Sequence, residues 1–148
     1  MMNRIKNFQL RNNIYAKNDS NTSFAYLSLK WETGIRPIES FVKNIKEENI
    51  TKELLKLHRI EDEDIKNFRK PGSIGKTTKE KLIEQLKSNI GWEYLKSIMP
   101  TPEEDKIAKK VGTNLTALKE SQINALIKYS NWLAEVQIRL YLPHLITK

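Results

Sequence analysis

The sequence contains no cysteine and only two histidines, and these absences narrow the chemistry that the chain can perform. Without cysteine there is no disulfide, no thiol nucleophile and no thiolate ligand for a metal ion. His58 and His144 lie far apart in the sequence, and neither has a carboxylate at ligand spacing. We therefore expect no metal site and no other cofactor.

Long apolar runs are also missing. A membrane-spanning helix needs about 18 or more apolar residues, whereas the longest uncharged run, residues 20–29, is half polar. The first six residues lack the apolar core and the small-residue cleavage site of a signal peptide. We expect a cytoplasmic protein.

Positive charge is abundant and unevenly placed. The 148 residues include 26 Lys+Arg and 18 Asp+Glu, a net charge of +8, and a hydrophobic content of 39% that is sufficient for a core. Residues 66–87 contain seven basic and two acidic side chains, which gives +5 of the net +8. A local surplus of this size points to a polyanion as the partner.

Helical patterns dominate the chain after residue 37. Thr51 and Thr101 are typical N-cap residues, and Pro102 with Glu104 completes a strong helix start after Thr101. Residues 22–31 fit either a strand or the start of a helix. The pattern predicts an all-α protein with helices over about residues 38–49, 51–57, 61–70, 77–87, 101–111 and 116–142, and residues 92–99 as a short helix or a hinge.

The segment Pro71-Gly72-Ser73-Ile74-Gly75-Lys76-Thr77-Thr78 is expected to join two helices as a tight hairpin. Its glycines allow close backbone approach or positive φ, and Ile74 between them is expected to turn inward. If the second helix starts at Thr77 or Thr78, the amides of residues 75–78 face outward and can bind an anion. A helix start of this kind binds a phosphate group and makes no contact with the bases.

This segment resembles a helix-hairpin-helix motif, and the sequence upstream extends the likeness. Residues 40–50, Ser-Phe-Val-Lys-Asn-Ile-Lys-Glu-Glu-Asn-Ile, resemble the first helix of the C-terminal domain of the bacterial RNA polymerase alpha subunit. The resemblance covers about residues 36–90. It implies DNA binding in the minor groove by an arginine at the start of the first helix, a lysine near its end, and the hairpin.

Carried over residue by residue, the resemblance assigns the lysine to Lys46 and hairpin contacts to Gly75, Lys76 and Thr78. The arginine position holds Ser40, and Arg36, one turn earlier, is the candidate to replace the arginine. The missing arginine puts the reading of A·T tracts in the minor groove in doubt, whereas binding to the DNA backbone is still expected. The full set of expected nucleic-acid-binding residues is Lys46, Lys70, Gly72, Ser73, Gly75, Lys76, Thr77, Thr78 and Lys79.

These observations predict three parts: an N-terminal arm over residues 1–35, a helix-hairpin-helix domain over 36–91, and a C-terminal helical region over 92–148. The expected function is non-catalytic DNA binding in transcription or replication, for example of a phage or mobile element. The alternative is an adaptor that docks on a larger complex such as RNA polymerase. No catalytic arrangement of side chains is visible, so we do not expect an enzyme.

Three further patterns leave alternatives open. Tyr129, Trp132 and Val136 form an apolar stripe that fits a partner-docking surface, a homodimer seam or packing on its own domain. Residues 108–122 loosely fit a helix-turn-helix or an ordinary helical connection. The acidic residues 61–64 either cap a helix or bind a divalent cation.

Overall fold

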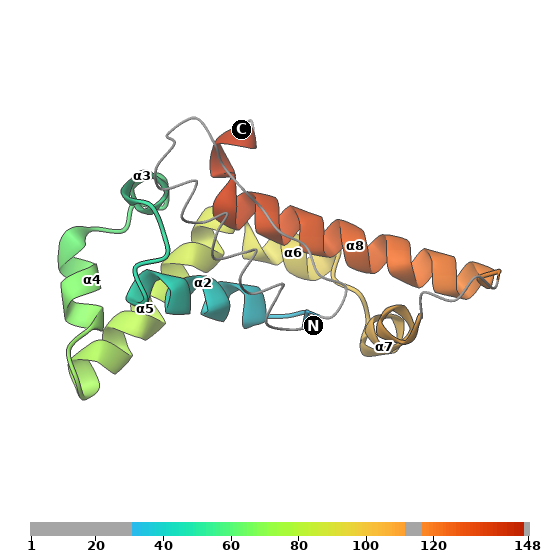
Figure 1. Cartoon of the computed structure of the whole chain (residues 1–148), viewed down its shortest axis with the longest axis horizontal. Helices are drawn as coiled ribbons and strands as arrows, with labels where there is room; N and C mark the ends of the chain where they lie inside the picture. The colour runs from blue at the N-terminus through green and yellow to red at the C-terminus, as the bar shows by residue number, and fades with distance from the viewer. Residues whose placement is uncertain (1–30, 112–116, 147–148) are drawn as a thin grey trace.

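The computed structural model describes residues 31–111 and 117–146, and these ranges are built from α-helices with one short 3₁₀ turn. No strand occurs in them, which confirms the all-α class. The long helix α8 runs along the molecule, with α4 near one end and α7 near the other (Figure 1). The elements are α2 (Arg36–Lys46), α3 (Lys52–Leu57), α4 (Asp62–Phe68), α5 (Ser73–Ile90), α6 (Trp92–Ser97), α7 (Pro102–Lys110), α8 (Glu120–Tyr141) and η1 (Pro143–Leu145).

Two helix starts follow the predicted capping chemistry. The Thr51 hydroxyl accepts a hydrogen bond from the amide of Leu54 at 3.3 Å. The Thr101 hydroxyl accepts one from the amide of Glu104 at 3.2 Å, and the Glu104 carboxylate accepts one from the amide of Thr101 at 2.7 Å. The starts of α3 and α7 are therefore confirmed, and each satisfies amides that a helix leaves unpaired.

Two other predicted boundaries change, and of the two alternatives for residues 92–99 the structure shows the short helix. Helix α2 begins at Arg36 rather than at residue 38, with Pro37 in its first turn, where a missing N–H costs nothing. Thr116, the expected start of the last helix, lies outside the described residues, and α8 begins at Glu120, after residues 117–119 that are not helical. Residues 92–99 contain the short helix α6, which starts after Gly91 at φ 68°.

The apolar stripe of α8 faces the interior of the molecule. Tyr129, Trp132 and Val136 are all 0% exposed, in a helix against which α2, α5, α6 and α7 pack. The Trp132 indole nitrogen donates a hydrogen bond of 2.8 Å to the backbone oxygen of Leu95. The prediction that these three side chains dock a partner or form a homodimer seam is therefore wrong, and the alternative of packing within the chain holds.

One hydrophobic core joins the two regions that the sequence divides at residue 91. Gly91 separates α5 from α6, but the helices before and after it contribute side chains to the same cluster. The core is therefore common to the expected domain over 36–91 and the expected region over 92–148. Fully buried members are Ile38, Phe41 and Val42 of α2, Leu82 and Leu86 of α5, Leu95 of α6, and Trp132, Val136 and Leu140 of α8.

The end of α3 is fixed in this core by His58, which is 1% exposed. Its ring meets the Phe41 ring edge to face, with centroids 5.2 Å apart. Its backbone oxygen accepts hydrogen bonds from the side-chain amides of Gln85 at 3.0 Å and Asn89 at 2.8 Å. Both amides belong to α5, so His58 ties α3 to α5.

The expected N-terminal arm lies mostly outside the described residues, which begin at Trp31. Trp31 is partly buried against the core, and its backbone oxygen accepts a hydrogen bond from the Tyr129 hydroxyl. The last residues of the expected arm are thus anchored on α8. Among the described helices, none has both the length and the apolar character needed to cross a membrane.

Candidate nucleic-acid interface

The junction between α4 and α5 is the place where the expected hairpin lies. Helix α4 ends at the buried Phe68, and the chain turns at Gly72, which has φ 81°. Helix α5 then begins at Ser73, and the amide of Lys76 donates the first intrahelical bond, of 3.3 Å, to the oxygen of Gly72. The predicted start at Thr77 or Thr78 is wrong, because the Gly72 conformation lets the chain enter the helix at once.

Gly75 brings the first turn of α5 against the end of α4. A Cβ atom at this position would lie 2.2 Å from the backbone oxygen of Lys70 and 3.0 Å from that of Phe68. No side chain fits this space. The two expected roles of glycine are therefore divided between two residues, with positive φ at Gly72 and close approach at Gly75.

The early start of α5 changes which groups can meet an anion. The amides of Ser73, Ile74 and Gly75 occupy the first turn and have no acceptor within the helix. Those of Thr77 and Thr78 lie inside it, and the buried Thr78 hydroxyl donates a 2.8 Å hydrogen bond to the oxygen of Ile74. The predicted anion contacts by the amides of Lys76 and Thr77 and by Thr78 are therefore wrong, because these amides lie within the helix and the Lys76 amide bonds to the oxygen of Gly72. Ile74 is 53% exposed and does not turn inward.

The first turn of α5 has no local group that neutralises it. None of the described side chains caps it, and its first turn contains no acidic residue. By contrast, the first turn of α4 contains Asp62, Glu63 and Asp64. The partial positive charge at a helix N-terminus therefore remains uncompensated at α5, and the exposed Lys76 adds a full charge beside it.

The structure brings most of the expected lysines to this junction. The Lys46 nitrogen lies 5.8 Å from the centroid of the Phe68 ring, which places the end of α2 beside the end of α4. The Lys70 nitrogen donates a 2.7 Å hydrogen bond to the neutral side chain of Asn67. Among the described residues, none of Lys46, Lys70, Lys76 and Lys79 forms an ion pair.

Other basic residues of the 66–87 surplus are already paired. Arg69 binds the carboxylate of Glu48 at 3.0 Å, and Lys81 binds that of Asp64 at 2.7 Å. The hydrogen bond that Lys81 donates to the Asp64 carboxylate raises the pKa of Lys81. These pairs reduce the free positive charge near the junction. The acidic residues 61–64 start α4, and the described residues contain no group of side chains arranged to hold a metal ion.

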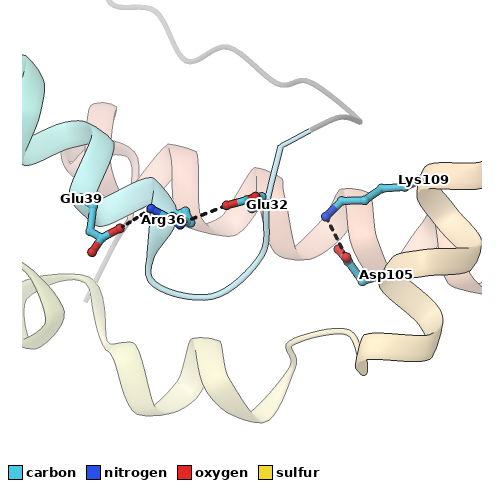
Figure 2. Close-up of polar contacts among 5 residues, drawn as sticks. All are labelled: Glu32, Arg36, Glu39, Asp105 and Lys109. Atoms are coloured by element: carbon cyan, nitrogen blue, oxygen red, sulfur yellow. Dashed lines mark hydrogen bonds and ion pairs between the residues drawn. The ribbon is translucent and has the colours of Figure 1, made fainter.

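Arg36, considered as a replacement for the arginine of the resembled family, lies elsewhere. It binds Glu32 at 2.9 Å and Glu39 at 3.3 Å (Figure 2). It is at the opposite end of α2 from Lys46, about 15 Å away along the helix axis. Arg36 is therefore neither free nor at the junction. The spacing of three and four residues to its acidic partners is a signal for this pairing in the sequence itself.

The helix-turn-helix pattern over residues 108–122 overlaps a gap in the described residues, because 112–116 fall outside them. Ala108 is 2% exposed and packs in the core, where α7 contacts α8. This arrangement fits an ordinary pair of packed helices.

Comparisons of the chain with protein-family models, with curated proteins and with solved structures give no match. The resemblance to the polymerase domain therefore depends on the motifs in residues 36–90 alone.

Proposed function

We propose that this protein binds DNA without catalysis, by holding the phosphate backbone at the junction of α4 and α5. The observation that carries the proposal is the uncapped first turn of α5, free of acidic residues, beside lysines that form no ion pair within the described chain. An anion at this turn gains backbone hydrogen bonds and a favourable helix dipole together.

In this proposal, the amides of Ser73, Ile74 and Gly75 donate to one phosphate. Lys76 and Lys79 extend the contact along α5, while Lys46 and Lys70 neutralise neighbouring phosphates. All of these contacts are to the backbone, so binding depends strongly on salt and weakly on base sequence. The expected settings, transcription or replication in the cytoplasm, remain predictions.

The three residues predicted to dock a partner do not support the adaptor alternative. Tyr129, Trp132 and Val136 are buried and offer no surface to RNA polymerase or to another complex. DNA binding is therefore the function that the described surface supports best.

A salt series of fluorescence anisotropy on labelled duplex DNA tests the proposal. Four neutralised phosphates predict a slope of log affinity against log salt of roughly −3 to −4. The double variant K76E/K79E should reduce this slope by about 2 and lower the affinity at low salt by at least about tenfold.

The matched control is K106E/K110E, which makes the same charge change on exposed residues of α7, at the other end of the molecule (Figure 1). If both double variants lose the same affinity, binding follows net charge alone and the assigned site is wrong. If the wild-type chain does not bind DNA at low salt, the proposed function is wrong.

A further inference from the structure

Arg69 lies within the proposed phosphate site, although its charge is paired there. The residue before it, Phe68, has its ring 5.8 Å from the Lys46 nitrogen. The residue after it, Lys70, has its backbone oxygen against Gly75 in the first turn of α5. Arg69 is therefore flanked by two residues that contact other parts of the site.

The side chain of Arg69 is held by Glu48, which follows the end of α2. Nη1 of the guanidinium lies 3.0 Å from Oε1 of the carboxylate, and the side chains of Arg69 and Glu48 are 40% and 70% exposed. An ion pair with this exposure is weak, because water and salt screen the two charges. Arg69 can therefore exchange Glu48 for another anion at little cost.

Lys81 is also paired close to the junction, but its partner is less accessible. The carboxylate of Asp64, which accepts a 2.7 Å hydrogen bond from Lys81, is only 15% exposed. Asp64 belongs to α4 and Lys81 to α5, so this pair joins two helices that pack together. Of the two paired cations, Arg69 is the one that an anion from solution displaces more easily.

Glu48 has a backbone conformation that glutamate rarely adopts. Its φ is 60°, in the left-handed region, where the end of a helix most often has glycine or asparagine. The turn is closed by backbone bonds, from the amide of Glu48 to the oxygen of Ile45 at 3.2 Å and from Asn49 to Asn44 at 2.9 Å. None of these bonds needs a carboxylate. A strained residue beside a binding site gives reason to look for a role of its side chain, and the contact with Arg69 provides one.

A DNA phosphate is a better partner for Arg69 than a single exposed carboxylate. A guanidinium is a planar fork of N–H donors that binds a phosphate bidentately, and it keeps its charge at any physiological pH. Along DNA, the neighbouring phosphates add to the attraction, which Glu48 alone cannot match. The exchange of Glu48 for a phosphate is therefore favourable once DNA is bound at the junction.

We propose that Arg69 leaves Glu48 and binds a DNA phosphate in the complex, so that Glu48 competes with DNA for Arg69 and lowers the affinity of the site. This inference rests on the proposed function and deepens it. Arg69 adds about 1 to the magnitude of the salt slope expected from the four lysines of the site.

A double variant with unchanged net charge tests the exchange. E48Q/R69Q removes both partners, so it leaves DNA binding unaltered if the ion pair stays closed in the complex. If Arg69 binds a phosphate, this variant should reduce the salt slope by about 1 and lower the affinity for duplex DNA at low salt by at least about threefold. Fluorescence anisotropy measures both quantities.

The matched control for the double variant is E84Q/K87Q. It removes an ion pair of 2.7 Å whose carboxylate is also 70% exposed, and Lys87 lies about 20 Å along α5 from Ser73. The control should change neither the slope nor the affinity. Equal losses in the two double variants, or an unaltered slope in E48Q/R69Q, would overturn the proposal.

The single variant E48Q tests the competition. Because it releases Arg69, the affinity for DNA at low salt should rise about two- to fivefold. E84Q makes the same charge change far from the junction and should raise the affinity by less than about 1.5-fold. Circular dichroism should show the helix content of the wild type in both variants. Equal effects of E48Q and E84Q would contradict the competition, because net charge alone then accounts for them.

The failure of this inference is distinguishable from that of the proposed function. If K76E/K79E loses affinity as expected but E48Q/R69Q binds DNA like the wild type, the junction binds DNA and only the role of Arg69 is wrong. If the wild-type chain does not bind DNA at low salt, both proposals are wrong.

Discussion

The Nε2 atom of His58 donates a hydrogen bond of 2.7 Å to the backbone oxygen of Leu140, across 82 positions of the sequence. The bond joins the end of α3 to the last turn of α8, where a helix leaves carbonyl oxygens unpaired. Burial of the ring lowers the pKa of His58 from its ordinary 6.5. The hydrogen bond to the backbone of Leu140 acts in the opposite direction and raises the pKa, but it is the smaller effect. The neutral ring is therefore the form that the native fold accommodates.

Acid should destabilise the protein through His58. The native state binds fewer protons at this ring than the unfolded chain, so the free energy of unfolding is highest above pH 6.5 and falls as the pH drops from 6.5 toward the lowered native pKa. Urea denaturation across this range measures the loss. The variant H58Q should be less stable at neutral pH and should lack this part of the pH dependence, whereas H144Q should retain it. An unchanged slope in H58Q would contradict the assignment.

Gly75→Ala should destabilise the protein, although alanine favours a helix by about 1 kcal/mol over glycine. The added Cβ meets the Lys70 oxygen at 2.2 Å and forces α5 away from α4. We expect a loss of about 1–3 kcal/mol in urea denaturation. The control is Ser73→Ala, an exposed position in the same turn, which should change stability by less than about 0.5 kcal/mol. Stabilisation by Gly75→Ala would show that the close approach is absent.

Trp132→Ala should cost about 3–5 kcal/mol of unfolding free energy, because it leaves a large cavity in the core. It also removes the donor to the oxygen of Leu95. The control is Leu57→Ala at an exposed site, with an expected change of less than about 0.5 kcal/mol. A Trp132 variant of normal stability would favour the docking interpretation over burial.

Lys46→Gln should weaken DNA binding and reduce the salt slope by about 1, because one phosphate contact is lost. Its effect on stability should be small, since the side chain is exposed. Lys43→Gln on the same helix is the comparison, as Lys43 is engaged by Glu47 at 3.6 Å. If the two variants change the salt dependence of DNA affinity equally, Lys46 makes no specific phosphate contact at the site.

Local chemistry accounts for the parts of the fold that the sequence predicts well. Thr51 and Thr101 cap helices because each cap acts on an amide three residues ahead, a relation that the sequence shows directly. The all-α class follows from periodicity over long segments in the same way. The ion pairs of Arg36 are also local and could have been read from the spacing of Glu32 and Glu39.

Long-range contacts account for most of what could not be predicted. Thr77 and Thr78 have the chemistry of caps, but α5 begins earlier, at Ser73, directly after the positive-φ turn at Gly72. The packing of Gly75 against the end of α4, which accompanies this early start, appears only in three dimensions. The stripe with Trp132 is visible in the sequence, whereas the helices that cover it are not. Nothing in the sequence near His58 indicates its partner, which is a backbone oxygen 82 positions away.

Helix α5 is held at both of its ends. Gly75 presses its first turn against α4, and the guanidinium of Arg139 donates a 3.2 Å hydrogen bond to the oxygen of Ile90 in its last turn. Between these points, Leu82 and Leu86 anchor the helix in the core. An anion arriving at Ser73 therefore meets donors whose positions are fixed in advance, and binding loses little entropy in ordering the backbone. The geometry of the proposed phosphate site therefore depends on the packing of the core, so a substitution that loosens either end of α5 should also alter the other end.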